Sequence, residues 1–148
     1  MLSPDIVGRV YPGRGAHEIR ALSITAFARA INDENPAYFD VDAARALGYP
    51  NLLAPPTYLV SIAIDEAQQA LTDPPVSIDW SRVVHGEQRF KFNRPIVAGD
   101  VLTCETAIEA VKSLAGSDFV TTRANFLDEQ GTLVANAWSI LVVRGPEA

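Results

Sequence analysis

The segment that most limits what this chain can fold into is residues 57–71, "TYLVSIAIDEAQQAL". Apolar side chains lie on nearly every side of its first turns, at Tyr58, Leu59, Val60, Ile62, Ala63 and Ile64. A helix that is apolar all round is a buried helix. Because this is the longest helical candidate and "TDPP" ends it, the sequence predicts one central helix surrounded by the rest of the protein.

The periodicity changes after residue 82, where "VVHGEQRFKFNRPIV" alternates. One predicted face carries Val84, Gly86, Gln88, Phe90 and Phe92, and the other carries Val83, His85, Glu87, Arg89 and Lys91. Short turns then join the segments "VLTCETAIEAV", "FVTTRANFLD" and "TLVANAWSILVVRG". We therefore expect an α+β domain, with an antiparallel sheet wrapped around the long central helix. A glycine inside a strand indicates a bulge or a close approach, which we expect at Gly86.

The first half of the chain is predicted to be mainly helix and loop. A helix over "ALSITAFARAI" is expected to start after Ser23 as its N-cap. A short helix, "VDAARAL", is expected to stop at Gly48 as the C′ residue. "YPNLLAPP" cannot be helical, because each proline biases the residue before it towards an extended conformation.

Length and charge narrow the class of protein. The 148 residues predict one domain, spanning residues 1–148. The net charge of −6 without a basic stripe argues against nucleic-acid binding. No signal-peptide pattern and no apolar run of ~20 residues is seen, so we expect a cytoplasmic protein that does not enter membranes. Cys104 is expected to be a buried apolar residue, and His17 and His85 are too few for a histidine-rich metal site, so no metal or cofactor is expected.

Three stretches together resemble the MaoC-like hydratases and dehydratases, which have the hot-dog fold. "NDENPAYFDVDAA" is similar to their active-site signature, an Asp, any residue, Asn, Pro, a small apolar residue and His, with Ala six positions later. Asp33, Asn35, Pro36 and Ala44 match it. "LLAPPTYL" lies where the family begins its central helix, and "RPIVAGDVL" resembles the turn that opens its strand meander. The resemblance extends roughly from residue 6 to residue 143.

Within that family, "DIVGRVYP", "LGYPNLLAPPTYL" and "SRVVHGEQRFKFNRPIVAGD" resemble the N-terminal-type half. This half also occurs as a separate small subunit, as in the (3R)-hydroxyacyl-ACP dehydratase of mycobacterial fatty-acid elongation. The resemblance implies pairing with a second hot-dog chain that carries the catalytic residues, with the two sheets joined edge to edge. An exposed sheet edge favours such pairing.

The resemblance also implies where the chemistry of the family lies, and this chain departs from it twice. The signature His position holds Tyr38, and an unperturbed tyrosine ionises near pH 10, too high for a base at neutral pH. Pro56, or Pro55 if the alignment shifts by one residue, replaces the glycine whose N–H holds the thioester oxygen, and proline has no N–H. Thr57 keeps its N–H and has a hydroxyl that can cap the helix.

Several of these residues have two readings. Tyr38 can donate a hydrogen bond or simply pack under the loop, and Asp33 and Asn35 are either site residues or turn formers. Leu59 and Ile62 are either substrate tunnel or plain core. Asn35, Pro56, Thr57, Leu59 and Ile62 are the candidate substrate-binding residues, and Asp33 and Tyr38 the candidate catalytic ones.

The competing catalytic candidate is His85, with Glu87 on the same predicted strand face as a base and its orienter. That face also carries Arg89 and Lys91, which indicates solvent or a rim. Arg82, Arg89, Lys91 and Arg94 are candidates for a basic patch. Such a patch would be needed to bind an acidic carrier protein or the phosphates of CoA, because the net charge of the whole chain is negative and repels both.

The leading hypothesis is a substrate-binding and structural subunit of an (R)-specific 3-hydroxyacyl-thioester dehydratase, with an acyl-ACP or acyl-CoA substrate and a hot-dog partner that supplies the chemistry. Two alternatives stay open. One is a self-sufficient homodimeric hydratase or thioesterase, and the other is a non-enzymatic acyl-binding protein.

Overall fold

The structure is a computed structural model and describes residues 2–72, 74, 76 and 78–145. Its strands are β1 (Val10–Glu18), β2 (Val83–Phe92), β3 (Val101–Leu114), β4 (Ser117–Leu127) and β5 (Leu133–Arg144). Its helices are α1 (Ala21–Ala30), α2 (Val41–Ala46) and α3 (Val60–Thr72), with the single 3-10 turns η1 (Pro4–Ile6), η2 (Pro36–Tyr38) and η3 (Trp80–Arg82).

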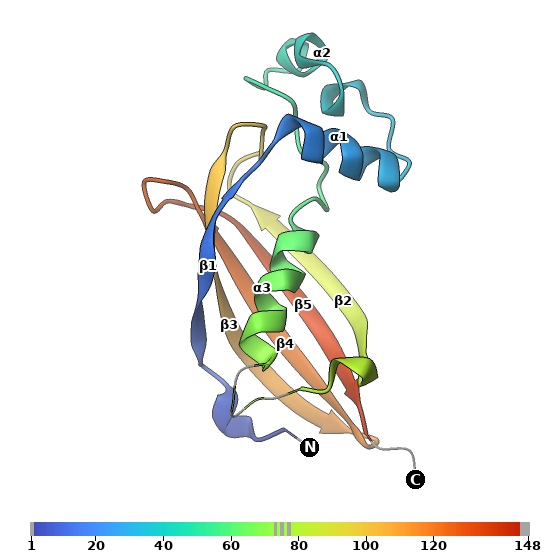
Figure 1. The fold of residues 1–148 in the computed structure, drawn as a ribbon, viewed down its shortest axis with the longest axis vertical. Helices are drawn as coiled ribbons and strands as arrows, with labels where there is room; N and C mark the ends of the chain where they lie inside the picture. The colour runs from blue at the N-terminus through green and yellow to red at the C-terminus, as the bar shows by residue number, and fades with distance from the viewer. Residues whose placement is uncertain (1, 73, 75, 77, 146–148) are drawn as a thin grey trace.

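The sheet is antiparallel and five-stranded, in the order β1-β3-β4-β5-β2. It curves around α3, while α1, η2 and α2 lie beyond one end of it (Figure 1). The predicted α+β hot-dog fold, with the sheet wrapped around a central helix, is confirmed. None of the described helices is long and apolar enough to cross a membrane.

Small side chains let α3 lie close to the sheet. Ala63, Ala67 and Ala70 are buried on the helix, and Ala124 and Ala137 are buried on β4 and β5. The contacts of α3 with the sheet run mainly to β1, β3, β4 and β5. The strand β2 therefore lies at the side of the sheet that the helix covers least.

The central helix begins later than its apolar pattern predicts. Residues 56–59 form a turn, in which the Tyr58 N–H donates to the carbonyl of Pro55 and the Val60 N–H donates to the carbonyl of Thr57. Pro55 and Pro56 stand at the start of this turn, and each biases the residue before it towards an extended conformation.

Strand β1 was not expected in the first half of the chain, which was predicted to be mainly helix and loop. Its sequence contains Pro12 and Gly13, two residues that are uncommon in strands, so the sequence did not indicate a strand here. The register of β1 against β3 shifts between Pro12 and Ala16. Proline and bulges are tolerated because β1 is an edge strand. Buried Glu66 of α3 holds the irregular stretch, accepting from the Arg14 N–H and, at 2.9 Å, from His17 Nε2.

Strand β2 contains the bulge expected at Gly86, but the bulge changes which side chains share a face. His85 is paired with Leu141 of β5, whereas Glu87 is paired with Ile140, so Gly86 is the extra residue. The predicted alternation of residues 83–92 is therefore wrong before Gly86. Val83 and His85, not Val84, lie on the same face as Gln88, Phe90 and Phe92. Val83 packs against the apolar core, while Val84 is 43% exposed.

Two local predictions have different outcomes. Helix α1 begins at Ala21 with Arg20 as its N-cap, so the prediction that Ser23 caps it is wrong. The Ser23 side chain instead hydrogen-bonds Tyr58, which packs edge-on against Phe27. The prediction at the end of α2 is confirmed, because Gly48 follows it in the left-handed region with a φ of 91°.

Gly13 gives a direct test of the packing of β1. A Cβ on Gly13 would lie 2.1 Å from the carbonyl oxygen of Cys104, whereas a Cβ on Gly86 would meet Val142 at 3.2 Å. We expect Gly13→Ala to lower the free energy of unfolding by about 1–3 kcal/mol and Gly86→Ala to lower it less. Denaturant unfolding measures both, and a Gly13→Ala protein as stable as the unmodified chain would contradict this packing.

Candidate functional site

The signature loop, residues 32–40, connects α1 to α2 and is built from backbone turns. Asn32 has a left-handed φ of 55°. The Asp33 carboxylate accepts from the Asn35 N–H at 3.1 Å, and the Asn35 side chain accepts from the Ala37 N–H at 3.0 Å to start η2. In this conformation both side chains bond their own backbone two residues on, the turn-forming use of Asp and Asn.

Tyr38 points into the protein from this loop. It is 4% exposed and belongs to the larger apolar core cluster. Burial raises the pKa of its phenol above the ordinary value, the nearby charge of Asp33 raises it further, and a hydrogen bond with Asn35 opposes them. A phenol with a raised pKa stays protonated at neutral pH, so it can donate a hydrogen bond but cannot remove a proton.

The segment before α3 links this loop to a cavity. The Leu53 N–H donates to the carbonyl of Ala37 at 3.0 Å, and the Ala54 N–H donates to the carbonyl of Ile96 at 2.8 Å. Pro56 and Thr57 follow and are both exposed. At this position Pro56 offers no N–H, so a thioester oxygen placed beside it would find no donor there.

The cavity has a volume of about 320 Å³, which is within the range of small-molecule sites. Its walls come from the segment before α3 and from the end of β2, and include Leu53, Ala54, Pro56, Phe92, Arg94 and Ile96. The lining is mostly apolar, and the one cation in it, Arg94, is held by Asp100 at 2.8 Å. Such a site suits an apolar group with few polar atoms.

The remaining predicted site residues lie elsewhere. Leu59 is 1% exposed inside the larger core cluster, and Ile62 is half-buried against it. His85 is exposed near the start of β2, and its Nε2 donates to the carbonyl of Glu87 at 3.0 Å. The start of β2 and the signature loop lie at opposite ends of the sheet (Figure 1), so the structure does not bring His85 and Asp33 together.

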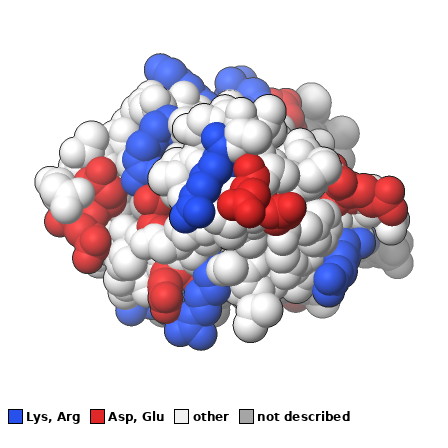
Figure 2. All heavy atoms as spheres, turned by 90° about the horizontal axis from the view of Figure 1, so that it is seen from above, with Lys and Arg blue, Asp and Glu red and all other residues white. Residues whose placement is uncertain are grey.

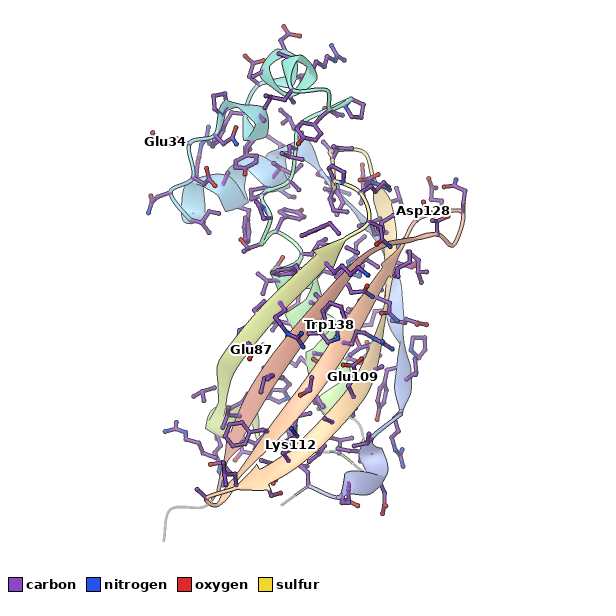
Figure 3. All side chains as sticks on the ribbon, turned by 180° about the vertical axis from the view of Figure 1, so that it is seen from behind. Glu34, Glu87, Glu109, Lys112, Asp128 and Trp138 are labelled. Carbon is purple, nitrogen blue, oxygen red and sulfur yellow. The ribbon has the colours of Figure 1, made fainter. Side chains whose placement is uncertain are left out.

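Three of the four cations considered for a basic patch already have partners. Arg94 pairs with Asp100, Arg89 pairs with Glu87 at 3.1 Å, and Arg82 donates to the carbonyl of Arg144. Figure 3 shows Glu87 and Trp138 on the sheet face turned away from α3, where Arg89 lies over the Trp138 ring. At the α2 end of the molecule, basic and acidic side chains are interspersed (Figure 2).

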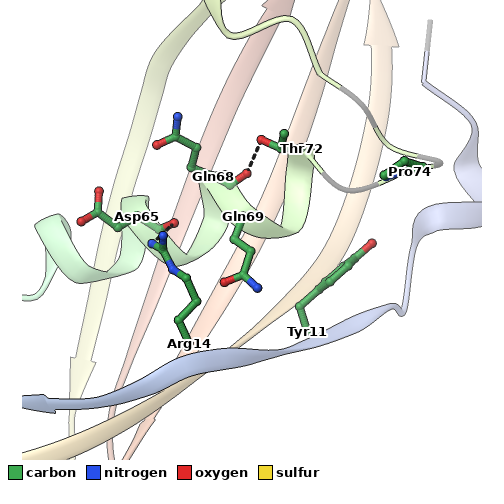
Figure 4. Close-up of a pocket in the computed structure, with 7 residues that line it drawn as sticks. All are labelled: Tyr11, Arg14, Asp65, Gln68, Gln69, Thr72 and Pro74. Carbon is green, nitrogen blue, oxygen red and sulfur yellow. Dashed lines mark hydrogen bonds between the residues drawn. The ribbon is translucent and has the colours of Figure 1, made fainter.

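A second cavity, of about 450 Å³, lies between β1 and α3 (Figure 4). Its lining is polar and includes Tyr11, Arg14, Asp65, Gln68, Gln69 and Thr72. Beside it, the buried Glu66 carboxylate accepts a hydrogen bond from Nε2 of half-buried His17 at 2.9 Å, a contact that the sequence alone did not predict. The only signal was one glutamate on the apolar side of the central helix. Among the described residues, no group of three or more His, Cys, Asp or Glu side chains could hold a metal ion.

Comparison with known proteins agrees with this architecture. Residues 5–137 match the family model described as "FAS1-like, dehydratase domain region". A UPF0336 protein of Streptomyces coelicolor is 47% identical over 146 residues, which is 99% of this chain and 97% of that protein.

Two solved structures are also similar. A chain of the C-terminally truncated HadBC (3R-hydroxyacyl-ACP dehydratase) complex from Mycobacterium tuberculosis has a TM-score of 0.87 and 32% identity, over 95% of this chain and 99% of that one. A MaoC-like dehydratase has a TM-score of 0.85 and 28% identity, over 95% of this chain and 43% of that one.

The sheet, the central helix and the signature loop define a hot-dog protein of the dehydratase type. The chain belongs to the FAS1-like dehydratase region family, whose members are MaoC-like.

Titration of Tyr38 tests the site geometry. Its folded pKa is raised, so the unfolded chain ionises first, near pH 10, and the protein loses stability as the pH rises above that value. We expect the difference in near-ultraviolet absorbance between the unmodified chain and Tyr38→Phe, which isolates one phenolate among the four tyrosines, to appear only above pH 10. The Tyr38→Phe protein should also lose less stability in alkali. A Tyr38 that ionises at or below its ordinary pKa would contradict the buried position.

Proposed function

We propose that this chain is the substrate-binding and structural subunit of an (R)-specific 3-hydroxyacyl-thioester dehydratase. A partner hot-dog chain with an intact signature Asp and His supplies the chemistry. The observation that carries the proposal is Tyr38, a buried phenol with a raised pKa where the family has its imidazole. Pro56 adds a second, independent loss, because it removes an oxyanion donor.

The reaction has demands that this chain meets only in part. A base must take the proton beside the thioester carbonyl, N–H donors must hold the enolate-like oxygen, and a proton must reach the departing hydroxyl so that water leaves. The product is a trans-2-enoyl thioester. Tyr38 cannot act as the base and Pro56 has no N–H to donate, whereas the apolar cavity beside Phe92 offers a surface for an acyl group.

The two edges of the sheet differ in their fitness for a partner. The β1 edge contains Pro12 and a bulge, both of which hinder strand addition. The β2 edge is unbroken after Gly86, and its last residue, Phe92, is 38% exposed. A partner sheet paired along β2 would also lie beside the cavity that Phe92 lines. The likeness to a chain of HadBC, a dehydratase complex, supports a partner of the same fold.

The net charge of this chain bears on which of the two chains binds the carrier protein or CoA. The net charge of −6 repels acidic carrier proteins and the phosphates of CoA, and Arg94, the cation in the cavity lining, is paired with Asp100. We therefore assign docking of the carrier or of CoA to the partner chain.

Crotonyl-CoA hydration, the reverse reaction, tests the proposal. We expect negligible turnover by the purified chain and recovery when a MaoC-type partner is added. Asp33→Asn in this chain should leave the turnover of the pair unchanged within about twofold, because Asp33 serves a turn that Asn also makes.

Two other outcomes would replace the proposal. Turnover by the chain alone that is lost in Asp33→Asn would identify a self-sufficient enzyme. Saturable acyl-CoA binding without turnover in any mixture would identify a non-enzymatic acyl-binding protein.

A further inference from the structure

The cavity beside Phe92 has an apolar floor and a partly polar rim. Ala54 and Ile96 are buried and form the floor, whereas Phe92 and Pro95 are exposed and belong to the rim. Arg94 lies between these two groups in exposure, with 37% of its side chain open to solvent. A molecule whose apolar end lies on the floor therefore leaves the cavity past a rim that contains a guanidinium group.

The guanidinium of Arg94 has N–H groups to spare, in a lining that offers few others. Leu53 and Ala54 give their N–H groups to backbone carbonyls, and Pro56 and Pro95 have none. Of the five N–H donors of Arg94, those on Nη1 are directed to the Pro95 carbonyl at 3.1 Å and to a carboxylate at 2.8 Å. Nε and Nη2 donate to no group in the described part of the chain, and both are open to solvent. A ligand in the cavity can therefore accept from them.

Two carboxylates decide which acceptor suits this guanidinium. Asp100 Oδ2 accepts from Arg94 Nη1 and, at 2.9 Å, from the Val97 N–H, so it holds the guanidinium against the cavity wall. The charge of Asp128 also acts on Arg94. Two negative charges near one cation disfavour a phosphate, but a neutral carbonyl oxygen can still accept a hydrogen bond there.

We propose that Arg94 is a substrate-binding residue that donates to an amide carbonyl in the pantetheine arm of the acyl thioester. The inference rests on the proposed function, since it requires the acyl group to lie on the floor of the cavity. Acyl-CoA and acyl-ACP both carry this arm between the thioester sulfur and a phosphate, and its amides supply neutral carbonyl acceptors. The arm follows the sulfur out of the cavity, and so it passes the rim at Arg94.

The experiment measures hydration of three crotonyl thioesters by this chain paired with a MaoC-type partner. Crotonyl-CoA carries the arm and the nucleotide phosphates, crotonyl-pantetheine carries the arm without the nucleotide, and S-ethyl thiocrotonate carries neither. A comparison of crotonyl-CoA with crotonyl-ACP in the unmodified pair shows which of the two carriers delivers the arm.

We expect Arg94→Met to raise KM about tenfold for crotonyl-CoA and for crotonyl-pantetheine, while kcat changes less than about twofold. The reason is that a donor lost from a non-reacting part of the substrate weakens binding without altering the chemical step. For S-ethyl thiocrotonate, kcat/KM should stay within about twofold. Arg94→Lys keeps a cation beside Asp100 but loses the planar fork, so it should show the same pattern with a smaller rise in KM.

Arg89→Met is the matched control, because Arg89 lies over the Trp138 ring on the sheet face turned away from α3 (Figure 3). It should leave KM for all three thioesters unchanged, and thermal unfolding verifies that each variant folds.

Three results would overturn the role of Arg94 and leave the proposed function standing. An equal loss with all three thioesters would show that Arg94 only supports the cavity wall, a loss confined to crotonyl-CoA would show that it binds phosphate, and no loss with any thioester would show that it binds neither. Absence of turnover by the unmodified pair with every thioester would instead defeat the proposed function, and this inference with it.

Discussion

The structure depends on how closely α3 lies on the sheet. Alanines on both surfaces allow this approach, and they place the helix over β1, β3, β4 and β5. The same arrangement leaves β2 with a partly exposed inner face and an unpaired edge. An unpaired strand edge of this kind can pair with a second sheet. Under the proposed function, that second sheet would complete the cavity beside Phe92.

The signature loop owes its shape to hydrogen bonds with its own backbone. Asp33 and Asn35 still form the turns that start η2, and the Leu53 N–H still ties the loop to the segment before α3. Tyr38 packs into the core, and its raised pKa keeps it protonated at neutral pH. The backbone bonds that shape the loop therefore do not depend on which side chain stands at position 38.

Much of the fold could be predicted because its signals are local. The apolar helix, the alternation of residues 101–144 and the stop at Gly48 each depend on neighbouring residues. Strand β1 was missed because Pro12 and Gly13 obscure its pattern, and only its position at an edge makes them tolerable. The cavity was beyond reach, since residues far apart in sequence form its walls. The motif located Tyr38, but its burial and raised pKa follow only from the packed core.

The most direct test of the central claim removes the partner's base. In the reconstituted pair, the signature histidine of the partner chain is replaced by alanine, and enoyl-CoA hydration is measured with this chain unmodified. If this chain only binds and supports, turnover falls to the uncatalysed background. Residual turnover that disappears when Asp33→Asn is added to this chain would show that it performs chemistry of its own.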